Sequence, residues 1–406
     1  MSTEPFSVPN SGAGSIYYDP YDVEIDRDPH PVWQRMREEQ PVWWNERYEF
    51  FALSRFEDVW EAYHDTATFS SSHGVMLETL DHEFNMPLVI FMDPPAHDVM
   101  RKLVSRAFTP RRINDLRVQV QALVAGYLDP LVGSGGFDAV VDYGALLPPM
   151  VIGHMLGVPE ADRDMLRHWF DDLLHREDDS AMPTADAMTA MGAVNDYALA
   201  MIADRRKNPR DDMISALIEA EVSDGGEVRR LNDVEVSSFI ILLAGAGVET
   251  VARFVSWAAV LLARNPDQRE ILVREPDLMS NAVEELLRYE APSPVNGRWT
   301  LRPFTAHGAE IPAGSKVLLL NGSANRDRRE FEEPDQLNVR REVRRHLSFG
   351  HGAHFCLGAA LARLEGELAL EGLITRFPQW DIDESALVPV QTSTVRGFSS
   401  VPISLG

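Results

Sequence analysis

The chain has a single cysteine, Cys356, among its 406 residues. One cysteine excludes an intramolecular disulfide and is typical of proteins kept in a reducing cytoplasm. Basic residues are also scarce, because 38 Lys and Arg stand against 63 Asp and Glu, which gives a net charge of −25. This acidity argues against nucleic acid or an anionic membrane surface as the main partner. We therefore expect a cytoplasmic protein that binds no nucleic acid.

Long apolar runs, a signal sequence and linkers are missing as well. The strongest apolar run, residues 239–248, is shorter than the ~18 residues that a membrane span requires. Residues 1–18 are polar and lack the basic start and apolar centre of a signal peptide. No Gly/Ser-rich tract, repeat or low-complexity stretch divides the chain. We expect no membrane anchor and a single domain over residues 1–406, in which residues 1–27 form an extended N-terminal segment.

Helical periodicity is abundant. Apolar residues recur at helical spacing in Pro31–Gln40, Arg55–His64, Ala96–Phe108, Arg112–Leu128, Pro149–Leu156, Ala161–Leu174, Ala185–Lys207, Asp233–Arg264, Asn281–Tyr289 and Leu357–Phe377. Aromatic and β-branched residues in 41–53 predict a hairpin, and the alternation in 292–320 predicts short strands. Residues 70–90 show no clear period and predict a loop. The fold class expected is mainly α with a smaller β region.

The longest predicted helix is Asp233–Arg264. Asn232 is a plausible N-cap with Glu235 as its capping-box partner, and the helix would run ~45–50 Å. Its interior contains Ala244-Gly245-Ala246-Gly247, although each glycine costs ~1 kcal/mol relative to alanine in a helix. We therefore expect a large group to pass close to this backbone, or the helix to open locally.

The cysteine lies in the run Phe349-Gly350-His351-Gly352-Ala353-His354-Phe355-Cys356-Leu357-Gly358. Taken alone, a single cysteine is most often a small buried apolar residue. This run, however, resembles the cysteine-ligand loop of cytochromes P-450. The resemblance implies a haem b whose iron takes an axial thiolate from Cys356, with the haem between the long central helix and the helix that follows the cysteine loop. Cys356 would stand ahead of that helix's N-terminus, whose dipole favours a thiolate.

A second motif is Glu285-Leu286-Leu287-Arg288. Residues three apart share a helix face, but an exposed pair of this kind is common and weak. The resemblance implies that Glu285 and Arg288 are buried, are joined by Arg341, and hold the cysteine loop. The loop before Arg341 departs from the family pattern, since Arg328 stands where proline is usual, and Leu337 and Asn338 replace Phe and Asp.

The third motif, Ala246-Gly247-Val248-Glu249-Thr250, is similar to the family's oxygen-activation segment. The implied catalytic residues are Thr250, which would hold water, and Glu249, which would connect it to solvent. The alternative is a threonine that bonds back to a helix carbonyl, with Glu249 in a structural ion pair.

Basic side chains are expected around the haem propionates. The resemblance assigns this role to His97 and Arg101 on one helix face, to Arg298 on a strand, and to His354 before the cysteine. It covers the chain from about residue 28 to residue 398.

The expected substrate pocket, also by resemblance, includes Ala246, Val295, Asn296 and Thr394. The loop 70–90 carries many apolar residues, which favours a lipophilic small-molecule substrate. Fatty acid, terpenoid, steroid and polyketide all remain open.

Electrons would come from a ferredoxin or flavodoxin with its reductase. Basic residues near the expected thiolate side favour an acidic partner; they are Arg101, Lys102, Arg106, Arg111, Arg112, Arg344 and Arg345. The sequence thus predicts a monooxygenase that activates O₂ with two electrons and hydroxylates or epoxidises its substrate. The alternatives are a peroxygenase on the same fold and a non-catalytic haem sensor or carrier.

Overall fold

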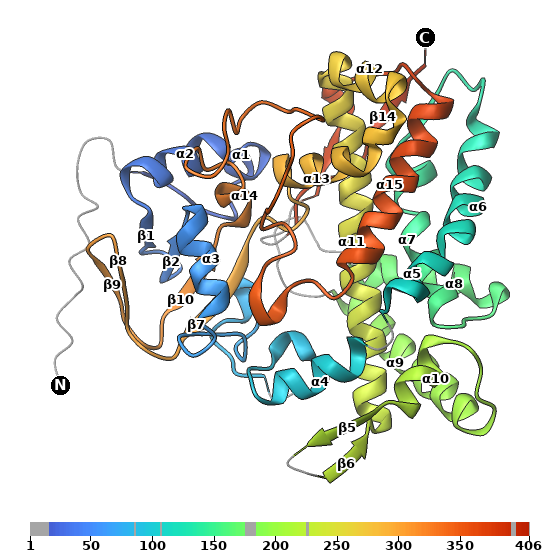
Figure 1. Ribbon diagram of the computed structural model, residues 1–406, viewed down its shortest axis with the longest axis horizontal. Helices are drawn as coiled ribbons and strands as arrows, with labels where there is room; N and C mark the ends of the chain where they lie inside the picture. The colour runs from blue at the N-terminus through green and yellow to red at the C-terminus, as the bar shows by residue number, and fades with distance from the viewer. Residues whose placement is uncertain are drawn as a thin grey trace.

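The computed structural model describes residues 16–84, 87–105, 108–174, 184–224, 227–390 and 395–405. Helices dominate (Figure 1): α1 Val23–Arg27, α2 His30–Glu39, α3 Phe56–His64, α4 Ala96–Ser105, α5 Pro110–Asp115, α6 Arg117–Leu128, α7 Leu147–Met155, α8 Glu160–Leu174, α9 Ala185–Lys207, α10 Met213–Glu219, α11 Asp233–Arg264, α12 Pro266–Arg274, α13 Met279–Tyr289, α14 Asn321–Ala324 and α15 Ala359–Arg376. The prediction of a mainly α protein with a smaller β region is confirmed.

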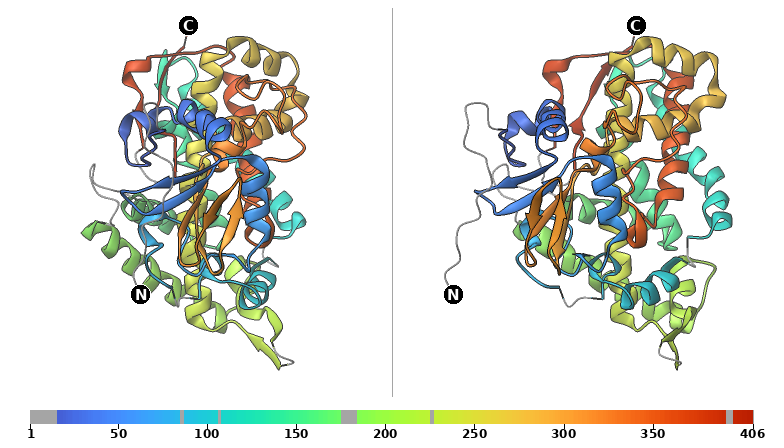
Figure 2. Two further views of the ribbon diagram at one scale, coloured as in Figure 1. Left: turned by 90° about the vertical axis from the view of Figure 1, so that its left-hand side faces the viewer. Right: turned by 60° about the vertical axis from the view of Figure 1, so that its left-hand side comes forward.

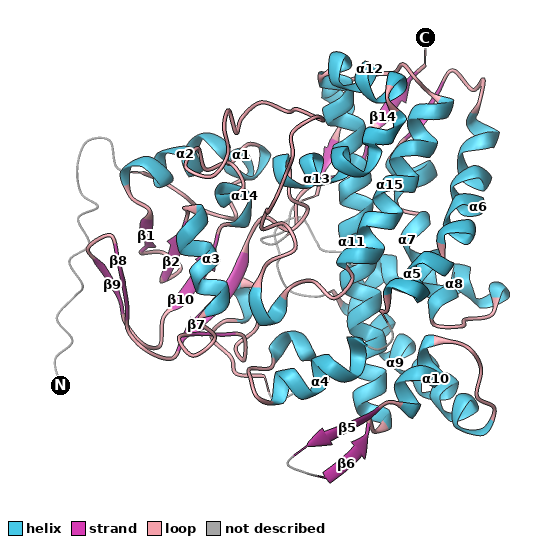
Figure 3. Ribbon diagram, in the orientation of Figure 1, coloured by secondary structure: helices cyan, strands magenta, loops and turns pink. Residues whose placement is uncertain are grey.

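The strands gather mostly on one side of α11, opposite the main body of helices (Figure 3). The main sheet has the order β1 (Val42–Asn45), β2 (Phe50–Leu53), β10 (Lys316–Leu319), β7 (Asn296–Thr300) and β3 (Phe69–Ser70). Only the β2–β10 pair in it is parallel. The smaller sheets are β11 (Asp381–Ile382) with β14 (Pro402–Ser404) and β4 (Gly136–Asp138), β12 (Val388–Pro389) with β13 (Phe398–Ser400), β5 (Glu221–Asp224) with β6 (Glu227–Arg230), and β8 (Phe304–Ala306) with β9 (Ala309–Ile311).

Alternation along the strands of the main sheet buries both of its faces. Phe51 and Val317 belong to an apolar cluster that includes residues of α3, whereas Phe50 and Leu318 belong to a second cluster with Trp33 of α2. Successive residues of a strand point to opposite faces, so one run of apolar residues serves both clusters. The sheet is thereby fixed between α2 and α3.

The long helix α11 passes through the middle of the molecule (Figure 2) and packs against α7, α9 and α15. Its predicted capping box is present: Asn232 accepts from the backbone N–H of Glu235, and Glu235 accepts from that of Asn232, both at 2.9 Å. By length and composition alone α11 is long and apolar enough to cross a membrane, with a mean hydropathy of 1.7 over an 18-residue window. Its position inside the helical core accounts for this apolar character.

The glycines of α11 do not open the helix, which is continuous from end to end. A Cβ on Gly247 would lie 2.6 Å from the side chain of Ile152 on α7, whereas one on Gly245 would meet nothing within 4 Å. Close packing between two helices therefore explains Gly247, and the alternative expectation, that the helix opens locally, is not met.

Other element boundaries differ from those expected. The predicted helix 112–128 is divided at Leu116 into α5 and α6. The predicted extended segment contains α1, whose N-cap Asp22 accepts from the backbone N–H groups of Glu24 and Ile25. The sequence also gave no sign of α10 or of the hairpin β5–β6.

Buried charges tie the N-terminal part to the core. Glu290 lies 2.7 Å from the ring of His30, 2.8 Å from the guanidinium of Arg326 and 2.9 Å from that of Arg396. Burial opposes ionisation, but the charges of these three partners outweigh it and hold the pKa of Glu290 well below its usual range. The network joins the start of α2 to the end of α13 and to the turn that precedes β13.

Candidate active site

A large cavity lies between α11, the main sheet and the cysteine loop, with about 1510 Å³ of empty space including its mouth. Most of the residues singled out from the sequence line it: His97, Arg101, Ala246, Thr250, Asn296, Arg298, His354 and Cys356. They come from α4, α11, β7 and the loop before α15, so the fold joins segments that are more than 250 residues apart in the chain.

The cysteine loop is held against the end of α3. Gly350 and Gly352 have positive φ angles of 60° and 65°, which only glycine adopts easily, and a Cβ on Gly352 would collide with the carbonyl oxygen of Tyr63. The backbone N–H of Cys356 donates to the carbonyl oxygen of Phe349 at 2.9 Å, which closes the loop. The thiol thus lies in the cavity wall just before α15.

Burial raises the pKa of the Cys356 thiol, and the backbone N–H of Gly358 and the charges of Arg101 and Arg363 offset this only in part. As expected, the start of α15 lowers the pKa of the thiol through the backbone N–H of Gly358, but desolvation has the larger effect. A metal ion at the sulfur removes the proton outright. The site accordingly suits a thiol that ionises when it binds a metal.

Basic side chains crowd the same wall. The rings of His97 and His354 lie 4.3 Å apart between centroids, and Nε2 of each is buried with no hydrogen-bond partner in the described part of the chain. Arg298 is buried beside them and donates to the carbonyl oxygen of its neighbour Gly297 at 2.7 Å. Burial, followed by the charges of Arg298, His97 and Arg101, lowers the pKa of His354 to about 2. Unsatisfied donors and excess positive charge at one place fit a bound group with carboxylates.

These observations fit haem. The cavity offers a sulfur ligand and, near it, a set of donors for two propionates, as the sequence resemblance implied. Nε2 of His97 and Nε2 of His354, which have no partner in the described part of the chain, belong to residues that the resemblance assigns to the propionates. The residues present therefore fit the group.

Across the cavity, α11 presents Ala246, Gly247 and Thr250. The Thr250 hydroxyl donates to the carbonyl oxygen of Ala246 at 2.9 Å, so its lone pairs remain available to accept a hydrogen bond from a water in the cavity. Glu249 does not line the cavity, and its carboxylate lies 3.9 Å from the guanidinium of Arg253. Both parts of the alternative are therefore seen, since Thr250 bonds back to a helix carbonyl and Glu249 forms an ion pair.

Glu285, Arg288 and Arg341 meet away from the cavity. Arg288 donates to both carboxylate oxygens of Glu285 at 2.7 and 2.9 Å, and Arg341 donates to the same carboxylate at 3.2 Å. Arg288 also donates to the carbonyl oxygens of Asn325 and Pro334, each at 2.9 Å. The three charged side chains thus fasten the loop that precedes Arg341.

That loop in turn supports the cysteine loop. The side chain of Asn325 accepts from the backbone N–H of Leu347 at 2.7 Å and donates to the hydroxyl of Ser348 at 2.8 Å. The departures of this loop from the family pattern do not break its link to Glu285. The backbone N–H of Asn338, one of the unusual residues, donates to the Glu285 carboxylate at 2.9 Å. Arg328 points outward and pairs with Glu38.

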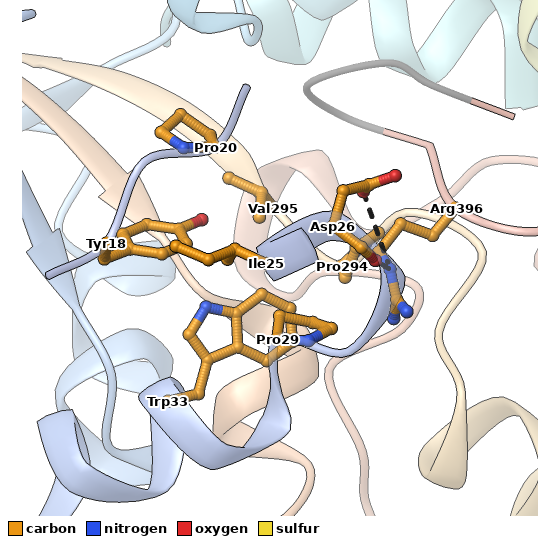
Figure 4. Close-up of a pocket in the computed structure, with 9 residues that line it drawn as sticks. All are labelled: Tyr18, Pro20, Ile25, Asp26, Pro29, Trp33, Pro294, Val295 and Arg396. Carbon is orange, nitrogen blue, oxygen red and sulfur yellow. Dashed lines mark hydrogen bonds and ion pairs between the residues drawn. The ribbon is translucent and has the colours of Figure 1, made fainter. Parts of the chain in front are cut away.

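Val295 and Asn296 were both expected in the substrate pocket, but they point to opposite sides of the sheet. Asn296 and Arg298 line the large cavity, whereas Val295 lies on the other side, in the apolar cluster with Tyr18 and Trp33. Val295 lines a much smaller hollow of about 290 Å³ beneath α1 (Figure 4). The expectation that Val295 lines the substrate pocket is therefore not met, because neighbouring strand residues face opposite ways. Thr394 lies outside the described residues.

One residue of the cavity wall was missed. Glu365 on α15 lines the cavity, is 1% exposed, and its Oε2 has no hydrogen-bond partner in the described part of the chain. Burial raises the pKa of Glu365 well above its usual range, so the carboxyl keeps its proton. In the sequence it is one acid among several in a predicted helix, which gives no sign that it faces inward.

The comparisons with known proteins identify the family. The sequence model of the Cytochrome P-450 family matches residues 27–403. Cytochrome P-450 130 of Mycobacterium tuberculosis is 38% identical over 387 residues, which cover 92% of this chain and 94% of that protein. The vitamin D(3) 25-hydroxylase of Pseudonocardia autotrophica is 36% identical over 405 residues, 97% of this chain and 98% of that protein.

Solved structures with the same fold are also similar in sequence. The cytochrome P-450 PksS of the bacillaene polyketide synthase of Bacillus subtilis has a TM-score of 0.87 and 31% identity, covering 96% of this chain and 100% of that one. A protein of Bacillus megaterium in complex with corticosterone has a TM-score of 0.84 and 31% identity, covering 94% of this chain and 99% of that one.

Proposed function

This chain belongs to the cytochrome P-450 family of haem-thiolate monooxygenases, and from that premise we propose that it oxidises a lipophilic small molecule with Cys356 as the axial ligand of a haem b. The observation that carries the proposal is the cavity lined by Cys356, Thr250, His97 and His354, in which Nε2 of each histidine has no hydrogen-bond partner in the described part of the chain. Bound haem supplies the iron chemistry that splits dioxygen and transfers one oxygen atom to the substrate.

The chain's own residues have distinct roles in this proposal. Cys356 would hold the iron, and His97, Arg101, Arg298 and His354 would hold the propionates. The proposed catalytic residue is Thr250, whose hydroxyl donates to the Ala246 carbonyl and would accept a hydrogen bond from a water that serves as a proton donor in the cavity. Glu249 acts through its pair with Arg253, which makes it a positioning residue for this part of α11.

The substrate is proposed to be apolar and bulky. Away from the sulfur, the cavity wall includes Val89, Ile90, Phe108, Phe239 and Leu243, and it is mainly hydrophobic with Asn296 as a polar contact. Relatives named for vitamin D₃ hydroxylation and solved with corticosterone support a molecule of this size and polarity. Hydroxylation or epoxidation of such a compound is the reaction we propose.

The electron donor is proposed to be a separate ferredoxin or flavodoxin with its reductase. Fewer cations are free to bind it than the sequence indicated, because Arg101 turns into the cavity, Arg112 lies 3.6 Å from Asp211, and Arg345 pairs with Glu330. Exposed cations that remain are Lys102, Arg111 and Arg344; Arg106 lies outside the described residues. The single thiol and this dependence on a soluble donor favour a cytoplasmic location.

The test is the absorption difference spectrum of the reduced protein with and without carbon monoxide. A strongly red-shifted Soret band in the wild type, lost in Cys356→His, supports thiolate ligation by Cys356. A band at the ordinary histidine-ligated position in the wild type contradicts it. Turnover of a steroid panel with a ferredoxin and its reductase then separates the alternatives: equal turnover with peroxide alone favours a peroxygenase, and binding without turnover favours a sensor or carrier.

A further inference from the structure

Two histidines face each other on the surface beside the cysteine loop. His64 is the last residue of α3, and its Nε2 lies 3.1 Å from Nδ1 of His351. Neither residue lines the large cavity, and the family site described above uses neither. Two ring nitrogens at this separation either share a hydrogen or converge on a cation.

The tautomer of His64 is fixed by the helix it ends. Its Nδ1 lies 2.8 Å from the carbonyl oxygen of Trp60, one turn earlier, and a carbonyl can only accept. Nδ1 therefore carries the hydrogen, and Nε2 presents its lone pair toward His351. Histidines that bind metals are oriented in the same way, by donation from the other ring nitrogen to a carbonyl.

The ring of His351 is suited to the same role because it stays neutral. Partial burial lowers its pKa, and the neighbouring His64 and Arg345 lower it further. Arg345 does not oppose a bound cation strongly, since its charge is compensated by Glu330 at 2.7 Å and by Glu57 at 3.6 Å. A metal ion requires unprotonated imidazole, which the lowered pKa of His351 favours.

The geometry matches two ligands of one metal ion. With metal–nitrogen bonds of about 2.1 Å, nitrogens 3.1 Å apart subtend an angle of about 95° at the metal, close to octahedral and within a small movement of tetrahedral. The ring centroids are only 4.7 Å apart, which is shorter than a straight N–H···N bond of this length would place them. The rings are therefore bent away from a straight hydrogen bond, as two ligands of one ion would be.

Both rings are held in place without a ligand. The Trp60 ring packs on the ring of His351 with centroids 3.7 Å apart, and it lies 5.0 Å from that of His64. His351 is flanked by Gly350 and Gly352, whose backbone rests against α3. Because both side chains are already ordered, binding an ion would cost little side-chain entropy.

We propose that His64 and His351 form a binding site for a divalent transition-metal ion, Zn²⁺ foremost, which ties the end of α3 to the loop that carries Cys356. Imidazole ligands suit Zn²⁺, Cu²⁺ and Ni²⁺ and exclude Mg²⁺ and Ca²⁺, which take oxygen ligands. Within the described residues no group of three metal-ligating side chains is found, so water completes the coordination.

The test is calorimetric titration of the haem-loaded protein with zinc chloride near neutral pH, with Cys356 occupied by iron. We expect one ion per chain. His64→Gln and His351→Gln should each weaken binding by more than about 100-fold, since loss of even an outer partner costs about 10–100-fold. The control is His168→Gln, which removes an exposed histidine of α8 and should leave binding unchanged.

A second measurement uses Cu²⁺ as the probe. Electron paramagnetic resonance of the wild type should show two imidazole nitrogens on one copper, and each histidine variant should show one or none. The inference is overturned if zinc fails to bind at millimolar concentration, or if both substitutions leave its affinity unchanged. In either case His64 and His351 form a hydrogen bond and not a metal site.

Discussion

The carboxylate of Glu285 is held by the guanidinium of Arg288 through two hydrogen bonds of 2.7 and 2.9 Å, and neither side chain is exposed to solvent. Arg288 also donates to the carbonyl oxygens of Asn325 and Pro334, so the pair fixes the loop to which the cysteine loop is hydrogen-bonded. Its loss should therefore affect both stability and haem retention.

Arg288→Ala should lower the free energy of unfolding by about 3–5 kcal/mol, because it leaves the buried Glu285 carboxylate without its main partner. Chemical denaturation and the haem-to-protein ratio measure this. The matched control is Arg340→Ala, which breaks an exposed pair with Glu275 and should change the free energy of unfolding far less. Similar losses in the two variants would contradict a special role for the buried pair.

The sequence predicted those parts of the fold that depend on local signals. The bounds Asp233–Arg264 agree with α11 because Asn232 and Glu235 cap one end and Asn265 ends the other. The helix α12 was not predicted, although it begins at Pro266 and proline is favoured at the first position of a helix. Side chains whose burial is decided by distant segments, such as Glu365 and Val295, left no local signal.

Gly352→Ala should destabilise the cysteine loop by about 1–3 kcal/mol or more, since the new Cβ needs a positive φ and collides with the Tyr63 carbonyl. Gly308→Ala is the control, because its φ is also positive at 78° but a Cβ there meets nothing within 4 Å. We expect a weakened red-shifted carbon monoxide band in the first variant and a normal one in the second. A normal band and unchanged stability in both would show that the contact with α3 is unimportant.

Thr250→Ala should keep haem and substrate binding but reduce product formed per electron pair by about tenfold or more, because the hydroxyl that holds water is lost. Thr250→Ser should restore most of the coupling. Glu249→Gln, which alters the pair with Arg253, should reduce the product formed per electron pair less than Thr250→Ala does. The measurement is the ratio of product to reduced cofactor consumed, and an unchanged ratio in Thr250→Ala would remove Thr250 from the mechanism.

Glu365 links stability to pH in a direction that can be tested. Its pKa is raised in the folded protein by burial, so above the ordinary pKa of a glutamate the unfolded chain releases a proton that the folded chain keeps. Stability then falls as pH rises through this window, by up to about 1.4 kcal/mol per pH unit for one proton. Glu365→Gln removes the ionisation while preserving size, so its stability relative to wild type should increase from about pH 5 to about pH 8. Infrared spectra should show a protonated carboxyl band at neutral pH that disappears in the variant. A constant difference in stability across this range, with no such band, would mean that Glu365 is ionised and has a partner within the cavity.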